Sequence, residues 1–201
     1  MAYYHELITE QSFAELKRLK TLFPFVLIGG WATYFYTRGL KSKDIDIIVP
    51  YETLPVIRKH YDCTKNDRLK KYEAVRGPVQ IDIYLPHYSA LGIPAEVLLE
   101  RTQRLAGFTV LGLSYLLALK IHTLRARGHS PKGTKDFFDI LALLQTPATD
   151  LPALRAILNE YGLARDFAVF REFLRERTEA AEIGLTKHAY AKLRRRVEET
   201  K

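Results

Sequence analysis

Residues 25–49 have the sequence FVLIGGWATYFYTRGLKSKDIDIIV. The first four of these residues are apolar, and a run of that length predicts a buried strand. The run ends at Gly29-Gly30, after which Trp31 to Arg38 predict a helix. Residues 43–49 then alternate Asp and Ile, which is the pattern of a second strand. The segment therefore predicts a strand, a glycine turn, a helix and a strand in direct succession.

The polar residues of this segment have the properties of a site for phosphate and metal. Glycines between a strand and a helix let backbone amides approach a phosphate without obstruction by a side chain, and the start of the helix adds free N–H groups. Asp44 and Asp46 stand two positions apart on a strand, so their carboxylates project from the same face. Because these carboxylates repel each other, a hard divalent cation such as Mg²⁺, bridging to nucleotide phosphates, is the expected partner.

A third acid lies further along the chain. In residues 79–85 the odd-numbered positions are all apolar, so Asp82 points to the opposite face of the strand. If this strand lies beside the Asp44–Asp46 strand, the three acids can hold two metal ions roughly 3.5–4 Å apart. Taken singly, the glycines fit a tight turn, the Asp pair a solvated strand face and Asp82 an exposed edge. Their joint order favours a functional site.

The rest of the chain predicts an α/β part followed by helices. The first part is expected to contain helices at 7–22 and 53–61 and strands at 68–76, 79–85 and 104–111. Helical spacing then recurs at 113–127, 134–144, 151–161, 165–180 and 186–199. We therefore expect an α/β (α+β) fold. It would have a small mixed sheet with flanking helices over residues 1–112 and a C-terminal helical bundle over residues 113–201, and the two parts could share one core.

The composition is that of a folded intracellular protein. Of 201 residues, 47% are hydrophobic and 27% are charged, which is ordinary globular usage. The single Cys63 excludes an internal disulfide and favours a reducing compartment. No apolar run approaches the ~18 residues of a membrane span, and the first ten residues carry two Glu and no Lys or Arg, unlike a signal peptide. We therefore expect a cytoplasmic protein.

The motif Gly29-Gly30, a spacer of thirteen residues, Asp44-Ile45-Asp46 and a later Asp82 resembles that of the DNA polymerase β-type nucleotidyltransferase superfamily. Within it, Gly-Gly-Trp-Ala and the Ser-Lys before Asp44 are similar to the AbiEii and MenT toxin-type branch. Residues 116–121 and 135–140 look like that branch's Leu-Leu-x-x-Lys helix and Lys-Asp-x-x-Asp helix. Members with Gly-Ser carry a hydroxyl where this chain has Gly30, so backbone amides would hold the nucleotide here.

The resemblance implies a nucleotidyltransferase-type fold and a Mg²⁺-dependent transfer of a nucleotide from an NTP, with a two-metal site. The catalytic residues would be Asp44, Asp46, Asp82 and Asp136, and the first three of them would bind metal. The nucleotide would be bound by Gly29, Gly30, Ser42 and Lys120. Asp82 would also take the proton from the attacking hydroxyl.

Two of these residues have simpler interpretations. From its position alone, Lys120 fits better as a lysine at the edge of the bundle whose ammonium reaches water; with the resemblance, contact with the triphosphate is favoured. Asp136 could form a surface ion pair with Lys135, which contributes little. Asp139, nearly one helical turn further on, is expected to be structural.

Positive charge is concentrated in the second half of the chain, within a net charge of +8. Residues 1–100 hold 13 Lys and Arg against 12 Asp and Glu, whereas residues 101–201 hold 18 against 11. Residues 101–135 contain seven Lys or Arg and no acid, which fits an anionic partner as well as a solvated basic face. Together with the resemblance, this predicts RNA as the acceptor, plausibly the 3′ end of tRNA. The expected RNA contacts are Arg125, Arg127, Lys132 and Lys135.

Two other functions stay open at this point. The acceptor could be a protein or a small molecule, although small cationic acceptors would prefer an acidic cleft to a basic surface. The chain could also be a non-catalytic module that binds a nucleotide, RNA or a partner protein, but a degraded site has no need of three clustered carboxylates. A toxin-type protein further implies a cognate antitoxin.

Overall fold

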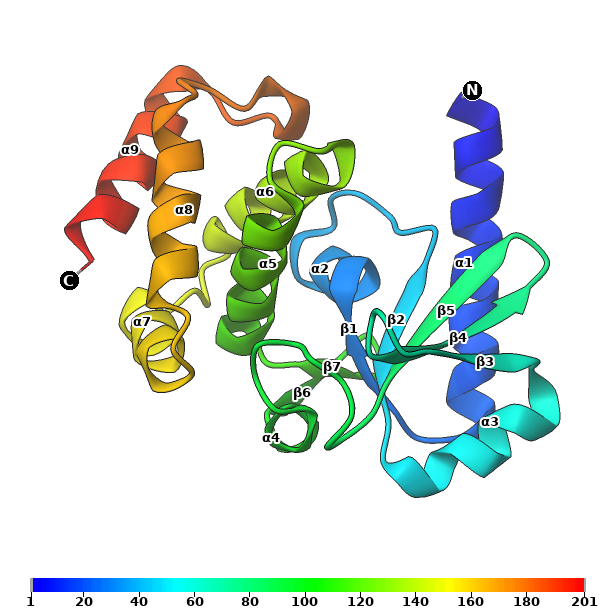
Figure 1. Cartoon of the computed structure of the whole chain (residues 1–201). Coiled ribbons are helices and arrows are strands. Elements are labelled where there is room, and N and C mark those ends of the chain that lie inside the picture. Colours follow the sequence, from blue (N-terminus) through cyan, green and yellow to red (C-terminus); the bar gives the residue numbers. More distant parts are fainter. Residues whose placement is uncertain (1, 201) are drawn as a thin grey trace. The chain divides into compact units, whose positions relative to one another are not determined.

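A computed structural model gives the fold of residues 2–200 and the side chains of residues 6–200. The chain divides into two compact units, one ending at Gly112 and one beginning at Leu113 (Figure 1). None of the described helices is both long enough and apolar enough to cross a membrane.

The first unit is built on a mixed seven-stranded sheet in the order β3-β4-β5-β2-β1-β7-β6. The pairs β2–β5 and β1–β7 are parallel, and the other neighbours are antiparallel. The elements of this unit are α1 (Ala2–Leu22), β1 (Val26–Ile28), α2 (Gly29–Thr37), β2 (Ile45–Ile48), α3 (Leu54–His60), β3 (Cys63–Asn66), β4 (Lys71–Arg76), β5 (Val79–Tyr84), α4 (Ala95–Glu100), β6 (Thr102–Leu105) and β7 (Phe108–Leu111). This confirms the expected mixed sheet with flanking helices.

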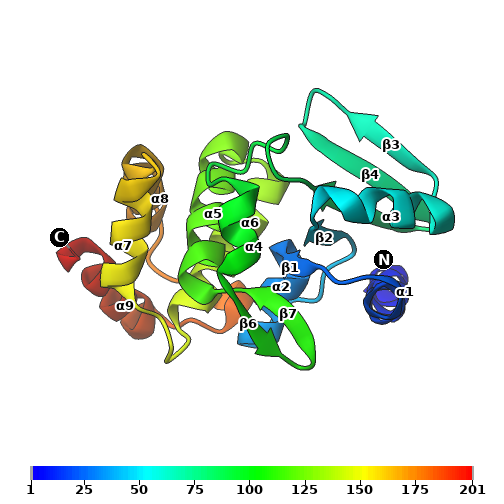
Figure 2. The ribbon, with the colours of Figure 1, turned by 90° about the horizontal axis from the view of Figure 1, so that it is seen from below.

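The central strands are fixed by alternation of buried apolar and polar residues. The isoleucines of β2 and β5 are at most 1% exposed. Because side chains alternate along a strand, Ile45 and Ile47 of β2 lie on the face opposite to Asp46, and the isoleucines of β5 lie on the face opposite to Asp82. Helix α1, seen end-on in Figure 2, lies alongside the sheet and contacts β5. Its Ser12 accepts a 2.8 Å hydrogen bond from the indole of Trp31, a core residue of α2.

Several elements of the sheet unit differ from the prediction. The strand expected at 104–111 is a hairpin, β6–β7, because Ala106 and Gly107 both have positive φ, 49° and 79°, as a two-residue hairpin turn requires. Strand β4 begins at Lys71 rather than Arg68, after a turn. Strand β3 and helix α4 were not predicted; both are short, and β3 carries only polar residues after Cys63.

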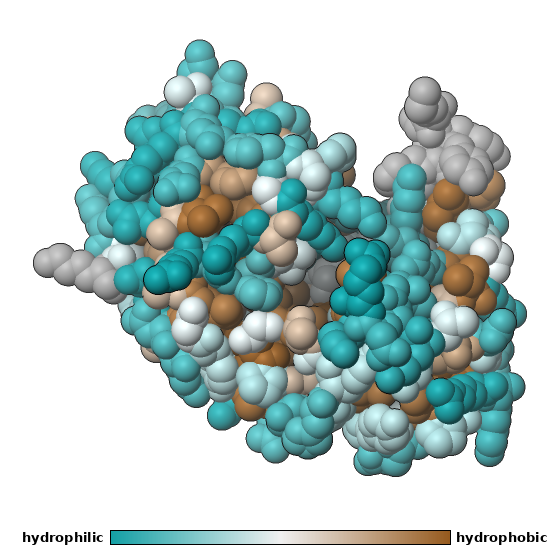
Figure 3. Space-filling view, viewed as in Figure 1, coloured by the Kyte–Doolittle hydropathy of each residue, from teal (hydrophilic) through white to brown (hydrophobic). Residues whose placement is uncertain are grey.

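The second unit is helical in the part of the chain that the structure describes. Its helices are α5 (Leu113–Arg127), α6 (Pro131–Leu144), α7 (Leu151–Glu160), α8 (Ala164–Arg175) and α9 (Lys187–Glu199). Helix α5 contacts α6, α7 and α8. Helix α6 begins earlier than expected because Ser130 accepts the Gly133 N–H as an N-cap, with Pro131 at the first helical position. On the face seen in Figure 3, the outer side of α8 and α9 is mostly hydrophilic.

Candidate active site

Three neighbouring strands each place one acid in a single row across the sheet. Asp46 of β2 pairs with Asp82 of the parallel strand β5. Asp82 in turn pairs with Glu73 of the antiparallel strand β4. Residues directly opposite each other on adjacent strands lie on the same face. We call Asp46, Asp82 and Glu73 the carboxylate row.

Asp44 stands outside this row. It is exposed, and it precedes the first residue of β2 by one position. Among residues 6–200 the structure contains no group of three or more His, Cys, Asp or Glu arranged to hold a metal ion. The expected neighbouring strands are present, but the three aspartates do not form a ready-made centre for two metals.

The donor chemistry nevertheless fits one divalent ion that arrives with a nucleotide. Mg²⁺ is usually held by one or two carboxylates together with substrate phosphates rather than by a complete protein cage. Asp46 and Asp82 are adjacent carboxylates of that kind. The fit is partial, because Asp82 already has two partners within the protein.

These partners are a lysine and a glutamine. Lys71 Nζ lies 2.6 Å from Asp82 Oδ2 and 2.9 Å from Glu73 Oε1, and Gln80 donates a 2.8 Å hydrogen bond to Asp82 Oδ1. Burial works against the charge of Lys71, but its hydrogen bonds to Asp82 and Glu73 outweigh this effect and raise its pKa. The same ammonium lowers the pKa of Glu73.

Glu73 and Lys71 were missed in the sequence, although a signal for them exists. The hairpin turn Gly77-Pro78 sets Arg76 opposite Val79, and counting back from that pair puts Glu73 opposite Asp82. Because side chains alternate along β4, Lys71 is then on the same face as Glu73. Register counting could therefore have found both residues.

Gly29 makes room for the Asp46 carboxylate. Ile28, the last residue of β1, pairs with Asp46, and α2 starts at the next position with Gly29 at φ +65°. A Cβ atom on Gly29 would lie 2.1 Å from Asp46 Oδ2. The Asp46 carboxylate therefore borders the glycine turn where a phosphate is expected to bind. This turn is the start of α2, where the helix dipole favours negative charge.

We expect Gly29→Ala to distort the site as well as the backbone. The positive φ alone should reduce the free energy of unfolding by about 1–3 kcal/mol, and the clash should displace Asp46 and lower nucleotidyl transfer. Gly77→Ala is a matched control, because Gly77 has φ +57° but no atom within 4 Å of its Cβ position. Urea denaturation and transfer assays measure both effects. Equal loss of activity in the two variants would contradict the proposed contact.

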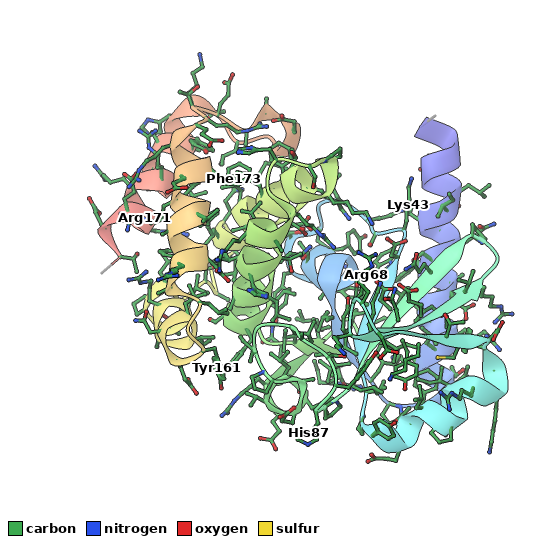
Figure 4. All side chains as sticks on the ribbon, in the orientation of Figure 1. Lys43, Arg68, His87, Tyr161, Arg171 and Phe173 are labelled. Atoms are coloured by element: carbon green, nitrogen blue, oxygen red, sulfur yellow. The ribbon has the colours of Figure 1, made fainter. Side chains whose placement is uncertain are left out.

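The remaining predicted nucleotide contacts of this unit lie nearby in the sequence. Gly30 is buried in the first turn of α2, and Ser42 is buried in the segment that leads to β2. Lys43, labelled in Figure 4, extends from the same segment. Their roles toward a nucleotide stay predictions.

In the helical unit, Lys120 lies in a buried ion cluster. Its Nζ is 2.8 Å from Asp136 Oδ1 and 2.7 Å from Asp139 Oδ2. Arg127 adds a 2.5 Å contact to Asp136 Oδ2. Burial opposes the charge of Lys120, but attraction by Asp139 and Asp136 outweighs it and raises the pKa of the lysine.

This cluster corrects two interpretations. Lys120 does not extend to water at the edge of the bundle, since it is 8% exposed and bound to two acids. Asp136 pairs with Lys120 and Arg127 rather than with its neighbour Lys135. Asp139, which the sequence analysis expected to be structural, is a direct partner of Lys120.

The acid-free run is likewise not a freely charged surface. Arg125 lies 2.7 Å from Asp166 of α8, and the same buried acid contacts His122 Nδ1 at 2.6 Å. Of the expected RNA contacts, Arg125 and Arg127 are therefore paired with acids from other helices. Lys132 is exposed and Lys135 half-buried, and neither has an ion pair within residues 6–200. These ion pairs could not be seen in residues 101–135 alone, because the partner acids Asp136 and Asp166 come later in the chain.

The sheet, with acids on β2 and β5 beside a helix that starts at Gly-Gly, defines the nucleotidyltransferase fold. The antibiotic-resistance factor ANT(2'')-Ia aligns with a TM-score of 0.55 and 12% identity, over 88% of this chain and 100% of that one. A putative nucleotidyltransferase from H. pylori aligns with a TM-score of 0.53 and 15% identity, over 94% of each chain. JHP933 from Helicobacter pylori gives 0.50 and 16%, over 94% of this chain and 91% of that one.

The chain belongs to the family of AbiEii nucleotidyl transferase toxins of type IV toxin–antitoxin systems, whose profile matches residues 14–200. A comparison with curated protein sequences finds no significant match. The protein is therefore a nucleotidyltransferase enzyme of the toxin type, as the sequence motifs predicted. Membership of this family implies an NTP substrate and an antitoxin partner.

Proposed function

We propose that the protein transfers a nucleotidyl group from an NTP to RNA in a Mg²⁺-dependent reaction in the cytoplasm, with the 3′ end of tRNA as the expected acceptor. The observation that supports this most is the pairing of Asp46 with Asp82 beside Gly29. In a chain of a nucleotidyltransferase toxin family, that arrangement is where charge neutralisation and proton transfer would take place.

The reaction forms one bond to phosphorus and breaks another. The oxygen of an acceptor hydroxyl bonds to the α-phosphorus of the NTP, the bond from that phosphorus to the bridging oxygen breaks, and pyrophosphate leaves. Asp82 would take the hydroxyl proton. Asp82 Oδ2 accepts a hydrogen bond from Lys71, and Oδ1 accepts one from Gln80. A carboxylate oxygen can accept two hydrogen bonds, so each oxygen of Asp82 has one acceptor position left. Transfer of this kind depends mainly on positioning and charge neutralisation.

Mg²⁺ would be held by Asp44, Asp46 and Asp82 together with phosphate oxygens, and it would neutralise negative charge there. Gly29 and Gly30 would present backbone amides to the nucleotide, and Ser42 would lie beside them.

In the helical unit, Lys120 would contact the triphosphate. Its ammonium has three donors, of which Asp136 and Asp139 use two, so one is left for a phosphate oxygen. Asp136 would then hold Lys120 in place as well as belonging to the site.

RNA would bind through Lys132, Lys135 and the outward parts of Arg125 and Arg127, whose side chains are 51% and 43% exposed although each is paired. A guanidinium has five donors, so an ion pair does not exhaust it. The same pairing reduces the free positive charge, however. This favours, as a second candidate, an acceptor that is a protein or a small molecule.

The test is incubation of the protein with each NTP, labelled at the α-phosphate, and total cellular RNA in the presence of Mg²⁺. We expect label on RNA of tRNA size, removable by trimming the 3′ end, and no label with the Asp46→Asn variant. Label on protein or on a small molecule, with none on RNA, would establish the second candidate. No label on any acceptor, with all four NTPs, would contradict the proposed reaction.

A further inference from the structure

Two acids of the carboxylate row share one cation within the protein. Asp46, Asp82 and Glu73 are side by side on three strands, and like charges directly opposite each other on neighbouring strands destabilise a sheet. Lys71 is a cation placed against two of them, Asp82 and Glu73. The row therefore already contains one fixed positive charge at its β4–β5 end.

The ammonium of Lys71 is held as a structural part of the row. The residue is 7% exposed, and a buried charge is tolerated only where hydrogen-bonded partners compensate its loss of water. Glu73 is itself held by Asn66, whose amide donates a 3.2 Å hydrogen bond to Glu73 Oε1. Lys65 of the neighbouring strand β3 is far more exposed.

The contact occupies an oxygen that a metal ion would need. Asp82 Oδ2 is 2.6 Å from Lys71 Nζ, and Oδ1 accepts from Gln80. A Mg²⁺ ion binds oxygen at about 2.0–2.1 Å and requires nearly octahedral geometry. Two cations cannot share one side of a carboxylate oxygen at such distances, so a metal ion that binds Asp82 Oδ2 from the side of Lys71 has to displace the ammonium.

We propose that Lys71 is a built-in cation of the active site, which competes with divalent metal for Asp82 and takes the place of a second metal ion at the β4–β5 end of the row. This inference rests on the proposed function, in which Asp46 and Asp82 bind a metal ion together with the nucleotide. It makes Lys71 a positioning residue, since it acts through Asp82. It also explains why the three aspartates of the sequence motif do not form a two-metal centre as they stand.

Metal binding without nucleotide tests the competition directly. In Lys71→Met the row loses its cation, and Mn²⁺ should bind at least about tenfold more tightly than in the parent protein, since an opposite charge this close changes the cation affinity of a carboxylate by roughly one to three orders of magnitude. Free Mn²⁺ is measured by electron paramagnetic resonance. Lys65→Met removes the same charge from the neighbouring strand β3, at an exposed ion pair, and it should leave Mn²⁺ affinity unchanged.

Two further measurements test the competition even if Lys71→Met is poorly folded. In the thermal unfolding of Lys71→Met, Mn²⁺ should restore stability lost with the lysine, whereas Lys71→Arg should behave as the parent protein does. In the unmodified protein, acylation of the Lys71 amine, followed by mass spectrometry, should increase when Mn²⁺ is added, because metal releases the lysine from Asp82.

The outcomes separate this inference from the proposed function. Equal Mn²⁺ affinity in folded Lys71→Met and the parent protein, or Lys71 acylation that does not respond to Mn²⁺, would overturn the competition even if RNA is labelled. Tighter Mn²⁺ binding in Lys71→Met would support it even if the acceptor proves not to be RNA.

Discussion

Asp46→Asn is expected to reduce nucleotidyl transfer by a factor on the order of 10³, comparable to the loss of a main charge-stabilising group in other enzymes. The change keeps the shape of the side chain between Gly29 and Asp82 but removes its charge. Asp82→Asn should act similarly, since it removes both a carboxylate neighbour of Asp46 and the proposed proton acceptor. Initial rates with labelled NTP measure the effect.

The fold should survive this loss of charge. Because Asp46 is a carboxylate next to Asp82, Asp46→Asn relieves repulsion, and the melting temperature of this variant without metal should be unchanged or higher. Asp62→Asn is a suitable control, because Asp62 is an exposed acid of the same unit outside the carboxylate row. If Asp46→Asn retains parental activity, the row is not the catalytic site.

The strands β1, β2 and β5 and the polar faces that carry their acids could be predicted from the sequence because they follow from local rules. Alternation put Asp46 and Asp82 on polar faces, and the length of the apolar run at residues 25–28 gave the strand beside them. These rules depend on residues two to four positions apart, which are visible in a single chain. They could not locate β3, whose polar residues form a strand only because β4 pairs with them.

The partners of the charged residues could not be predicted in the same way. Lys120 contacts acids 16 and 19 positions later, and Arg125 contacts an acid 41 positions later. Such contacts depend on how helices pack, which no short-range pattern encodes. A run without acids therefore looked like a free basic surface, although two of its four expected RNA contacts are in ion pairs.

Lys120→Met should lower the free energy of unfolding by about 3–5 kcal/mol, the usual cost of removing one partner from a buried ion pair. Asp136 and Asp139 would both lose their contact with the ammonium at positions that are at most 5% exposed. The raised pKa of Lys120 means that its contribution to stability is complete at neutral pH and is lost as the pH rises from the lysine pKa of the unfolded chain through that of the folded protein. Urea denaturation from neutral to alkaline pH measures the loss of stability and its dependence on pH.

A control and a double variant distinguish this cluster from a general effect of charge. Lys132→Met removes an exposed lysine of the same helical unit and should change stability by no more than about 0.5 kcal/mol. In Lys120→Met combined with Asp139→Asn, one orphaned charge is gone, so part of the lost stability should return, with Arg127 still paired to Asp136. The opposite result would be that Lys120→Met unfolds at the parental urea concentration but loses NTP affinity in calorimetry with Mg²⁺. In that case Lys120 binds the triphosphate and contributes little to the stability of the fold. If Lys120→Met loses both stability and NTP affinity, Lys120 has two roles: two of its donors hold the buried cluster together, and the third binds the nucleotide.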